Sequence, residues 1–99
     1  MTMRAPFNPQ AGANLVVSPA VGSASSPINP KSKSVRLVNS GANICYVRIG
    51  FSSVTASTAD TPVLPNSSLI ISKAEGFDTI AYISAAGTSL NIQTGEGGV

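Results

Sequence analysis

The fold is decided between residues 35 and 51, which read VRLVNSGANICYVRIGF. Two apolar runs, 35–38 and 44–51, flank a turn at Ser40-Gly41-Ala42-Asn43. Both runs are short and rich in Val, Ile and Leu, are separated by a turn with Gly and Asn, and show no helical stripe, which favours β-strands. We therefore expect two antiparallel strands that are joined by this turn.

Successive side chains of a strand point to opposite faces, which predicts the side chains that share a face. Cross-strand neighbours lie on the same face of a sheet, so Leu37 can pair with either Val47 or Cys45. Either register places four side chains on the opposite face: Arg36, Val38, Tyr46 and Arg48. That face is either solvated or in contact with a partner, and we expect a partner because half of the face is apolar.

The same pattern continues to the end of the chain. Further strands are expected at 68–72, 79–84 and 88–94, after a Ser/Thr-rich loop at 52–61 and with turns at 74–78 and 85–87. No window has a sustained helical stripe. Short strands at this spacing predict an all-β body over residues 32–99, a small antiparallel β-sandwich that is jelly-roll-like or a partly open barrel.

Residues 1–31 have a different composition, with prolines at 6, 9, 19, 27 and 30 and small residues between them. Proline removes a ladder donor and biases the residue before it toward extended geometry. We expect an extended N-terminal arm with short edge strands at 14–17 and 20–24; a disordered tail is the alternative. Apolar residues such as Phe7, Leu15 and Val17 favour an arm that is ordered against the body or against a neighbouring subunit.

Composition argues against an enzyme. The 99 residues include no His, no Trp, one Cys and four acids. General acid–base catalysis, nucleophilic catalysis and zinc binding draw mainly on these residue types. We therefore expect no catalytic, metal or cofactor site. Cys45 has no partner for an intrachain disulfide, and we interpret it as a small buried hydrophobic residue.

Charge points to a protein that works in an assembly. Charged residues make up 10% of the chain against about 25% in an average protein, while hydrophobic residues make up 42%. So few charges suggest a surface that is partly covered by partners, including further copies in a homo-oligomer. The nearest thing to a basic cluster is Lys31, Lys33 and Arg36, which we interpret as a solvated strand edge, so nucleic acid is not an expected partner.

The sequence has no signal for export or for a membrane. The longest aliphatic runs are Leu15-Val16-Val17 and Leu69-Ile70-Ile71, far short of the ~18 residues of a membrane span. No apolar core of signal-peptide length follows Arg4. We expect synthesis in a reducing cytoplasm.

Three segments carry a resemblance to a known group of proteins. Residues 35–41, 45–50 and 59–65 resemble short proteins that are encoded among the virion genes of tailed bacteriophages, and residues 85–88 and 95–97 resemble their C-termini. The resemblance covers about residues 34–97. It implies a capsid decoration (cement) protein on the virion surface that binds neighbouring major capsid subunits, made in the cytoplasm of a host bacterium. A head–tail junction or tail-fibre adaptor is the alternative within the same group, and no catalytic residue is carried over.

These inferences predict a contact surface and leave one other class open. We expect partner contacts at Phe7, Leu15, Val17, Arg36, Val38, Tyr46 and Arg48. A carbohydrate-binding module is the second alternative, because loops on a sandwich can bind sugars. The absence of Trp leaves two Tyr and three Phe as possible stacking platforms.

Overall fold

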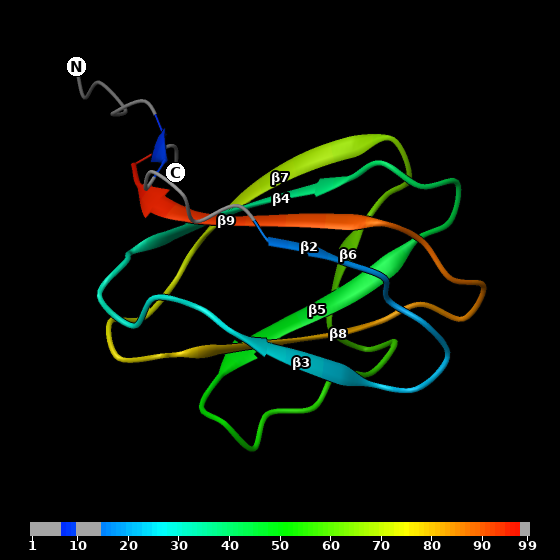
Figure 1. Cartoon of the computed structure of the whole chain (residues 1–99), viewed down its shortest axis with the longest axis horizontal. Helices are drawn as coiled ribbons and strands as arrows, with labels where there is room; N and C mark the ends of the chain where they lie inside the picture. The colour runs from blue at the N-terminus through cyan, green and yellow to red at the C-terminus, as the bar shows by residue number, and fades with distance from the viewer. Residues whose placement is uncertain (1–6, 10–14, 98–99) are drawn as a thin grey trace.

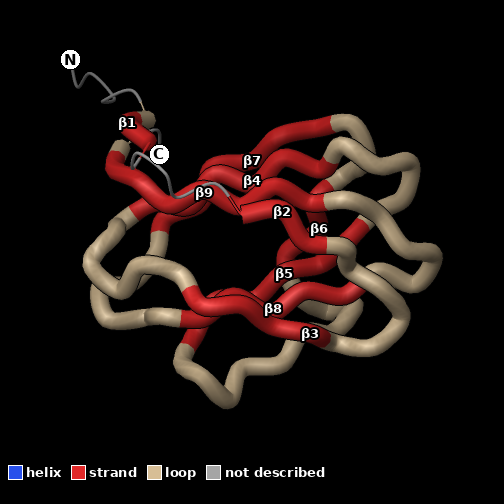
Figure 2. Tube along the Cα trace, viewed as in Figure 1, coloured by secondary structure: helices blue, strands red, loops and turns tan. Residues whose placement is uncertain are grey.

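A computed structural model describes residues 7–9 and 15–97. It confirms the predicted all-β fold: two antiparallel sheets pack face to face (Figures 1 and 2). In spatial order, the first sheet contains β2 (Leu15–Val17), β9 (Leu90–Glu96), β4 (Ser34–Asn39) and β7 (Ser67–Ser72), with β1 (Asn8–Pro9) following β2 along β9. The second contains β3 (Ala24–Pro27), β8 (Thr79–Ile83), β5 (Cys45–Gly50) and β6 (Thr61–Val63). This strand order is that of a jelly roll.

The core lies between the two sheets and follows the alternation of the sequence. Val35 and Leu37 point inward from β4, and Cys45 and Val47 point inward from β5, as predicted. Nine buried side chains form this cluster: Val35, Leu37, Cys45, Val47, Val63, Ile80, Tyr82, Leu90 and Ile92. Burial of apolar side chains on this scale is the main force that holds the two sheets together.

The predicted hairpin between residues 35–38 and 44–51 is wrong. β4 lies between β9 and β7, whereas β5 lies between β8 and β6 in the other sheet. Leu37 pairs with Leu69 and Ile92, and Val47 pairs with Thr61 and Tyr82. The turn after Asn39 therefore crosses from one sheet to the other. Alternation determines which side chains face the core, but two such strands can meet edge to edge or face to face.

The N-terminal segment belongs to the sandwich over its described residues 15–31. β2 pairs with β9 and agrees with the expected strand at 14–17, of which residue 14 lies outside the described residues. β3 begins at Ala24 instead of residue 20 and pairs with β8. The shift arises because the preceding loop joins another loop: Ala20 O accepts from Ser84 N (2.8 Å) and Pro19 O from Thr88 N (3.2 Å). Residues 1–6 and 10–14 of the predicted arm lie outside the described residues.

Candidate interaction surfaces

The seven residues of the predicted contact surface do not form one patch. Arg36 and Val38 lie on the outer face of the first sheet, where they line a shallow hollow of about 160 Å³ with Asn91 and Gln93. Tyr46 and Arg48 alternate with the buried residues of β5 and so face outward from the second sheet. The two pairs are therefore on opposite sides of the molecule, because β4 and β5 do not share a sheet.

The remaining members of the predicted set lie along the N-terminal segment. Leu15 and Val17 are half-buried and pack against the core cluster. Val16 between them points outward and is 61% exposed. Phe7 is half-buried beside β1. Sequence reasoning missed Val16 because it did not assign an inner and an outer face to this strand.

Four loops stand side by side at one end of the sandwich. In the first sheet, the last residues of β2 and β4 (Val17 and Asn39) lie level with the first residues of β9 and β7 (Leu90 and Ser67). The corresponding ends of β3, β8, β5 and β6 are level in the facing sheet. Each loop joins two strands that occupy equivalent places in the two sheets. We call these loops, residues 18–23, 40–44, 64–66 and 84–89, the neutral end, because none of them contains Asp, Glu, Lys or Arg.

The neutral end exposes apolar side chains. Val21 is 77% exposed and Leu64 is 58% exposed, one at each rim of the row of loops. Between them, Ala42, Ala85 and Ala86 are also exposed. The surface is therefore uncharged and partly apolar over the whole row.

The buried side chain of Asn39 ties the neutral end together. Its Nδ2 donates to Asn43 O (2.8 Å) and to Val63 O (3.0 Å), and its Oδ1 accepts from Gly41 N (3.1 Å) and Thr88 Oγ1 (2.7 Å). All four hydrogen-bonding positions of the amide are thus used. Two further bonds cross between loops: Asn43 Nδ2 donates to Gly87 O, and Ser84 Oγ donates to Ile44 O, each at 2.8 Å. The loops are held in one arrangement before any partner binds.

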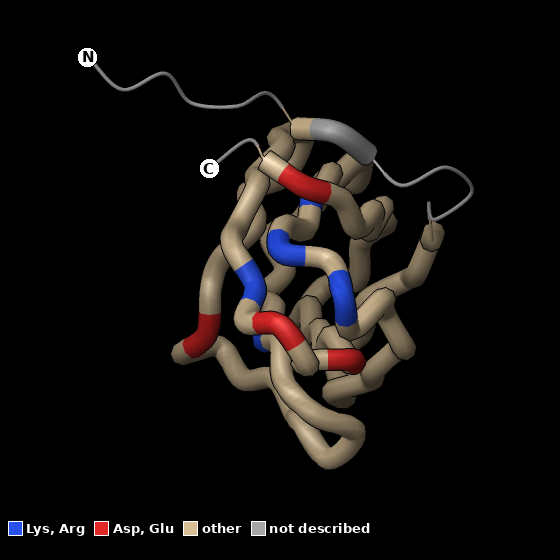
Figure 3. Tube along the Cα trace, turned by 90° about the vertical axis from the view of Figure 1, so that its left-hand side faces the viewer, with Lys and Arg blue, Asp and Glu red and all other residues tan. Residues whose placement is uncertain are grey.

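The opposite end of the sandwich is charged, as Figure 3 shows from that side. The loops between β3 and β4 and between β7 and β8, together with the end of β9, hold charges of both signs: Lys31, Lys33, Lys73, Glu75, Asp78 and Glu96. The other charged residues of the described ranges, Arg36, Arg48 and Asp60, lie along the sides. The molecule therefore has a charged and an uncharged end.

Lys73 connects the loops of the charged end by hydrogen bonds, as Asn39 connects loops of the neutral end. It is 6% exposed, and its Nζ donates to Pro30 O (3.1 Å), Ala74 O (3.2 Å) and Phe77 O (2.8 Å). Burial lowers the pKa of the ammonium group, while the charges of Glu75, Asp78 and Glu96 act in the opposite direction. The three carbonyls connect the β3–β4 loop to the β7–β8 loop.

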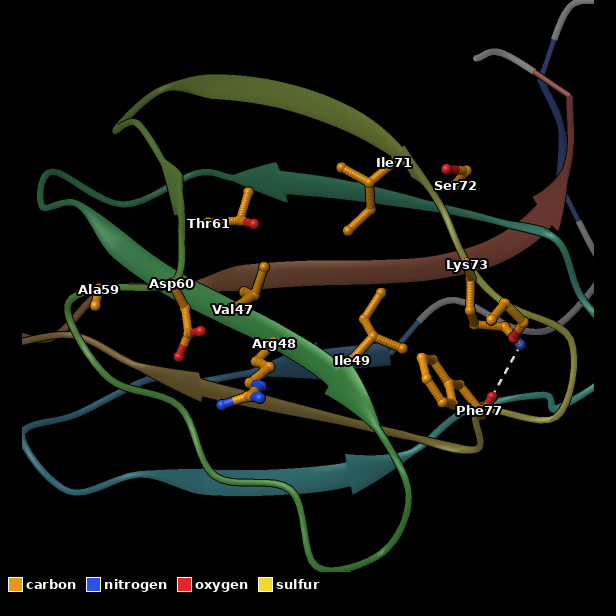
Figure 4. A pocket seen from close by; sticks show the side chains of 11 residues that line it. Val47, Arg48, Ile49, Ala59, Asp60, Thr61, Ile71, Ser72, Lys73 and Phe77 are labelled. Atoms are coloured by element: carbon orange, nitrogen blue, oxygen red, sulfur yellow. Dashed lines mark hydrogen bonds between the residues drawn. The ribbon is translucent and has the colours of Figure 1, made fainter.

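A trough runs along the side of the sandwich between β5 and β7 (Figure 4). It consists of two hollows of about 480 and 400 Å³ that share Arg48, Ile49 and Phe77. The trough is open here because β6 pairs with β5 only as far as Val47. Val47, Ile49 and Ile71 supply apolar lining, and Asp60, Thr61 and Ser72 supply polar groups.

Charged side chains of opposite sign face each other at this trough. Val47 pairs with Thr61, the first residue of β6, so Arg48 and Asp60 lie across from each other just before β6 begins. Asp60 Oδ2 accepts a 2.7 Å hydrogen bond from Ser57 N within its own loop. Arg48 is exposed, and its guanidinium is available to a ligand.

The described residues hold no metal cluster, no membrane-spanning helix and no reactive thiol. No group of three or more His, Cys, Asp and Glu side chains in residues 7–9 and 15–97 could hold a metal ion. No helix in those ranges is long and apolar enough to cross a bilayer. Cys45 is a free, buried thiol, and burial raises its pKa to about 11. A thiol with so high a pKa is a packing residue and a poor nucleophile.

Comparisons with known proteins bear on the fold alone. No family model and no curated protein matches the chain. Among solved structures, the chain is similar to the crystal structure of PirA, with a TM-score of 0.59 over 86% of this chain and 95% of that chain. The two sequences are 10% identical over the match. A likeness at that identity shows a shared architecture and says nothing about a shared activity.

Proposed function

We propose that this protein is a non-enzymatic structural component of a bacteriophage virion, a decoration protein that docks its neutral end onto neighbouring major capsid subunits. One observation carries the proposal: the described charges avoid one end of the sandwich, and that end exposes Val21 and Leu64. The resemblance of residues 34–97 to small virion proteins supplies the partner. Jelly rolls also occur in viral capsid proteins, which is an argument by analogy.

The physical chemistry of the neutral end suits protein contact. Cores of protein interfaces are depleted in charged residues, because a charge that loses water without gaining a partner is costly. Binding also costs entropy when loops become ordered. The hydrogen bonds of Asn39 reduce that cost, because the loops are already connected. The charged end, in this arrangement, faces solvent.

The polar groups along the trough support a structural role. Lys73 directs its ammonium group at three carbonyls, and Asp60 accepts from its own loop. Both side chains hold loops in place. A general acid or base must instead reach a substrate proton within hydrogen-bonding distance.

Reconstitution on particles tests the proposal. Phage particles that lack this protein are mixed with the purified chain, and bound protein is measured after sedimentation. Leu64→Glu and Val21→Glu should each abolish binding, because either places a charge in the contact. Phe51→Glu is the matched control, since Phe51 is 59% exposed, almost the same as Leu64, but lies in the β5–β6 loop away from the neutral end. Wild-type protein that does not bind, or Leu64→Glu protein that binds fully, would overturn the proposal.

Copy number separates decoration from the adaptor alternative. A decoration protein is present at a copy number comparable with that of the capsid subunits, whereas a head–tail or tail-fibre adaptor forms a single ring or a few copies. Quantitative mass spectrometry of purified particles gives this number. The same particles, gently dissociated, show by native mass spectrometry whether copies leave as the expected homo-oligomer.

A further inference from the structure

We propose that the trough beside β5 binds a neutral saccharide, with Arg48, Asp60 and Phe77 as its contact residues. The trough lies between the β5–β6 and β7–β8 loops, away from the neutral end, so a docked protein would leave it open to solvent. The inference concerns the isolated protein and stands whether or not the chain binds a capsid.

The trough offers a ring against which a sugar can pack. Phe77 lines both hollows, and its ring meets that of Phe51 edge to face, with centroids 5.0 Å apart and planes at 88°. Pyranose rings carry C–H groups on their faces, which pack on apolar and aromatic surfaces as other apolar groups do. Ile49 extends this apolar surface between the two hollows. Two hollows in series fit a ligand of two or more ring-sized units better than a single compact molecule.

The rim carries hydrogen-bonding groups that complement a diol. A guanidinium donates several hydrogen bonds in a fixed plane, and a carboxylate accepts several. Adjacent sugar hydroxyls can therefore accept from Arg48 and donate to Asp60 at the same time. Figure 4 shows the two side chains extending to the same side of the trough, with Phe77 near its other end.

The charge balance specifies a neutral sugar. Arg48 and Asp60 contribute one charge of each sign. Lys73, the third charged side chain in the lining, donates its ammonium hydrogen bonds to three carbonyls of the protein. An acidic sugar would gain at Arg48 but would meet the carboxylate of Asp60. A neutral, hydroxyl-rich ligand uses both groups without a charge penalty.

An extended peptide is the other ligand that this place could accept. Beyond Val47, β5 has no strand partner on the trough side among the described residues. That free edge covers only Arg48 to Gly50, and the β5–β6 loop folds against it, with Val54 next to Gly50. An edge this short can make few backbone hydrogen bonds to a peptide. We therefore favour a saccharide, because its hydroxyls would bond to side chains and not to the strand edge.

Saturation-transfer NMR on the full chain tests the inference. The probes are glucose, galactose, mannose and N-acetylglucosamine, each as monomer and β-linked or α-linked dimer, and a glycan array extends the search to longer neutral oligosaccharides. Saturation transfer should favour one of these neutral sugars over glucuronic acid, which is measured alongside them as the acidic probe. Its affinity should fall about tenfold or more in Arg48→Gln and in Asp60→Asn, the latter keeping an oxygen for Ser57 N. Arg36→Gln, an exposed arginine on the other sheet, is the matched control and should bind as wild type.

The outcomes are distinct from those of the particle assay. Absence of transfer to every monomer and dimer together with an empty array would overturn the inference, and so would undiminished binding by folded Arg48→Gln and Asp60→Asn proteins. Binding of extended peptides in the trough in place of sugars would also refute it. None of these results alters the expected effect of Leu64→Glu on particle binding.

Discussion

Thr88 donates a 2.7 Å hydrogen bond from its hydroxyl to Oδ1 of Asn39, a residue 49 positions earlier in the chain. This bond joins the β8–β9 loop to the end of β4. Asn39 Nδ2 continues the connection to Val63 O at the end of β6. A single amide thereby links segments that the sequence keeps far apart, and the shape of the neutral end depends on it.

Asn39→Asp should destabilise the protein strongly. The substitution replaces the amide nitrogen, which donates to Asn43 O and Val63 O, with a carboxylate oxygen that is repelled by the same two carbonyl oxygens. A buried group that loses its hydrogen bonds costs about 1–3 kcal/mol, and more when it is charged. Urea unfolding should therefore show a loss of at least about 2 kcal/mol. Asn91→Asp on the half-buried outer face is the control, and an equal loss there would contradict the role given to Asn39.

Gly41→Ala should disrupt the neutral end, whereas Gly22→Ala should not. A Cβ on Gly41 would overlap Thr88 Oγ1 and lie 2.8 Å from Ser89 N, while a Cβ on Gly22 meets nothing within 4 Å. The first variant must move the loop off the Asn39 network. We expect faster hydrogen exchange in residues 40–44 and 84–89 and a lower melting temperature. Identical exchange in both variants would show that the loops do not depend on this close approach.

Lys73→Met should loosen the charged end while the neutral end stays intact. The variant keeps an unbranched side chain but removes the three hydrogen bonds to Pro30 O, Ala74 O and Phe77 O. Each hydrogen bond to a charged group is worth about 1.5–3 kcal/mol, and relief of the desolvation of the ammonium offsets part of that sum. Hydrogen exchange should quicken in residues 28–33 and 73–78 but not in 40–44. Lys31→Met, at an exposed position in the same region, should leave both regions unchanged.

Cys45 should resist thiol reagents in the folded protein. Burial raises its pKa to about 11, so the thiolate is scarce at pH 8. We expect no reaction with Ellman's reagent at pH 8 until urea unfolds the chain, when one equivalent should react. Rapid labelling of the native protein would contradict the burial of the thiol.

The same thiol should make stability depend on pH in the alkaline range. The unfolded thiol ionises near its ordinary pKa of 9.0, while the folded one stays neutral to about 11. The unfolded state then binds fewer protons than the folded state, so stability falls as pH rises between these values. Urea midpoints at pH 8 and pH 10 measure the effect. Cys45→Ala should have a smaller decrease over this range, and an equal decrease would show that another group is responsible.

Much of the fold follows from alternation in the sequence. The inward positions Val35, Leu37, Cys45 and Val47 are correct because a strand with one buried face must alternate. The pairing of β4 with β5 was wrong because the same alternation fits both a hairpin and two facing strands. Pairing with distant strands decides between the two arrangements, because Leu37 of β4 pairs with Leu69 of β7 on one side and with Ile92 of β9 on the other.

The candidate surfaces are harder to predict from the sequence than the core. The four loops without Asp, Glu, Lys or Arg can be recognised in the sequence, but their common position depends on the register of the eight strands β2 to β9. The trough is harder to predict, since it exists where β6 begins at Thr61, opposite Val47, and leaves Arg48 without a described strand partner on that side. Phe77 reaches it from the β7–β8 loop, which Lys73 holds through Phe77 O and which Asp78 N ties to Gly50 O of β5.

The position of β9 governs when this protein can fold. β9, the last strand of the described residues, lies inside the first sheet between β2 and β4, so β2 has no neighbour in its sheet until residues 90–92 have been made. Contacts between such distant segments slow folding, because the intervening chain must first be brought together. Until residues 90–96 are available, the first sheet lacks an interior strand. A fragment that stops before Leu90 would therefore have open sheet edges that are prone to aggregate.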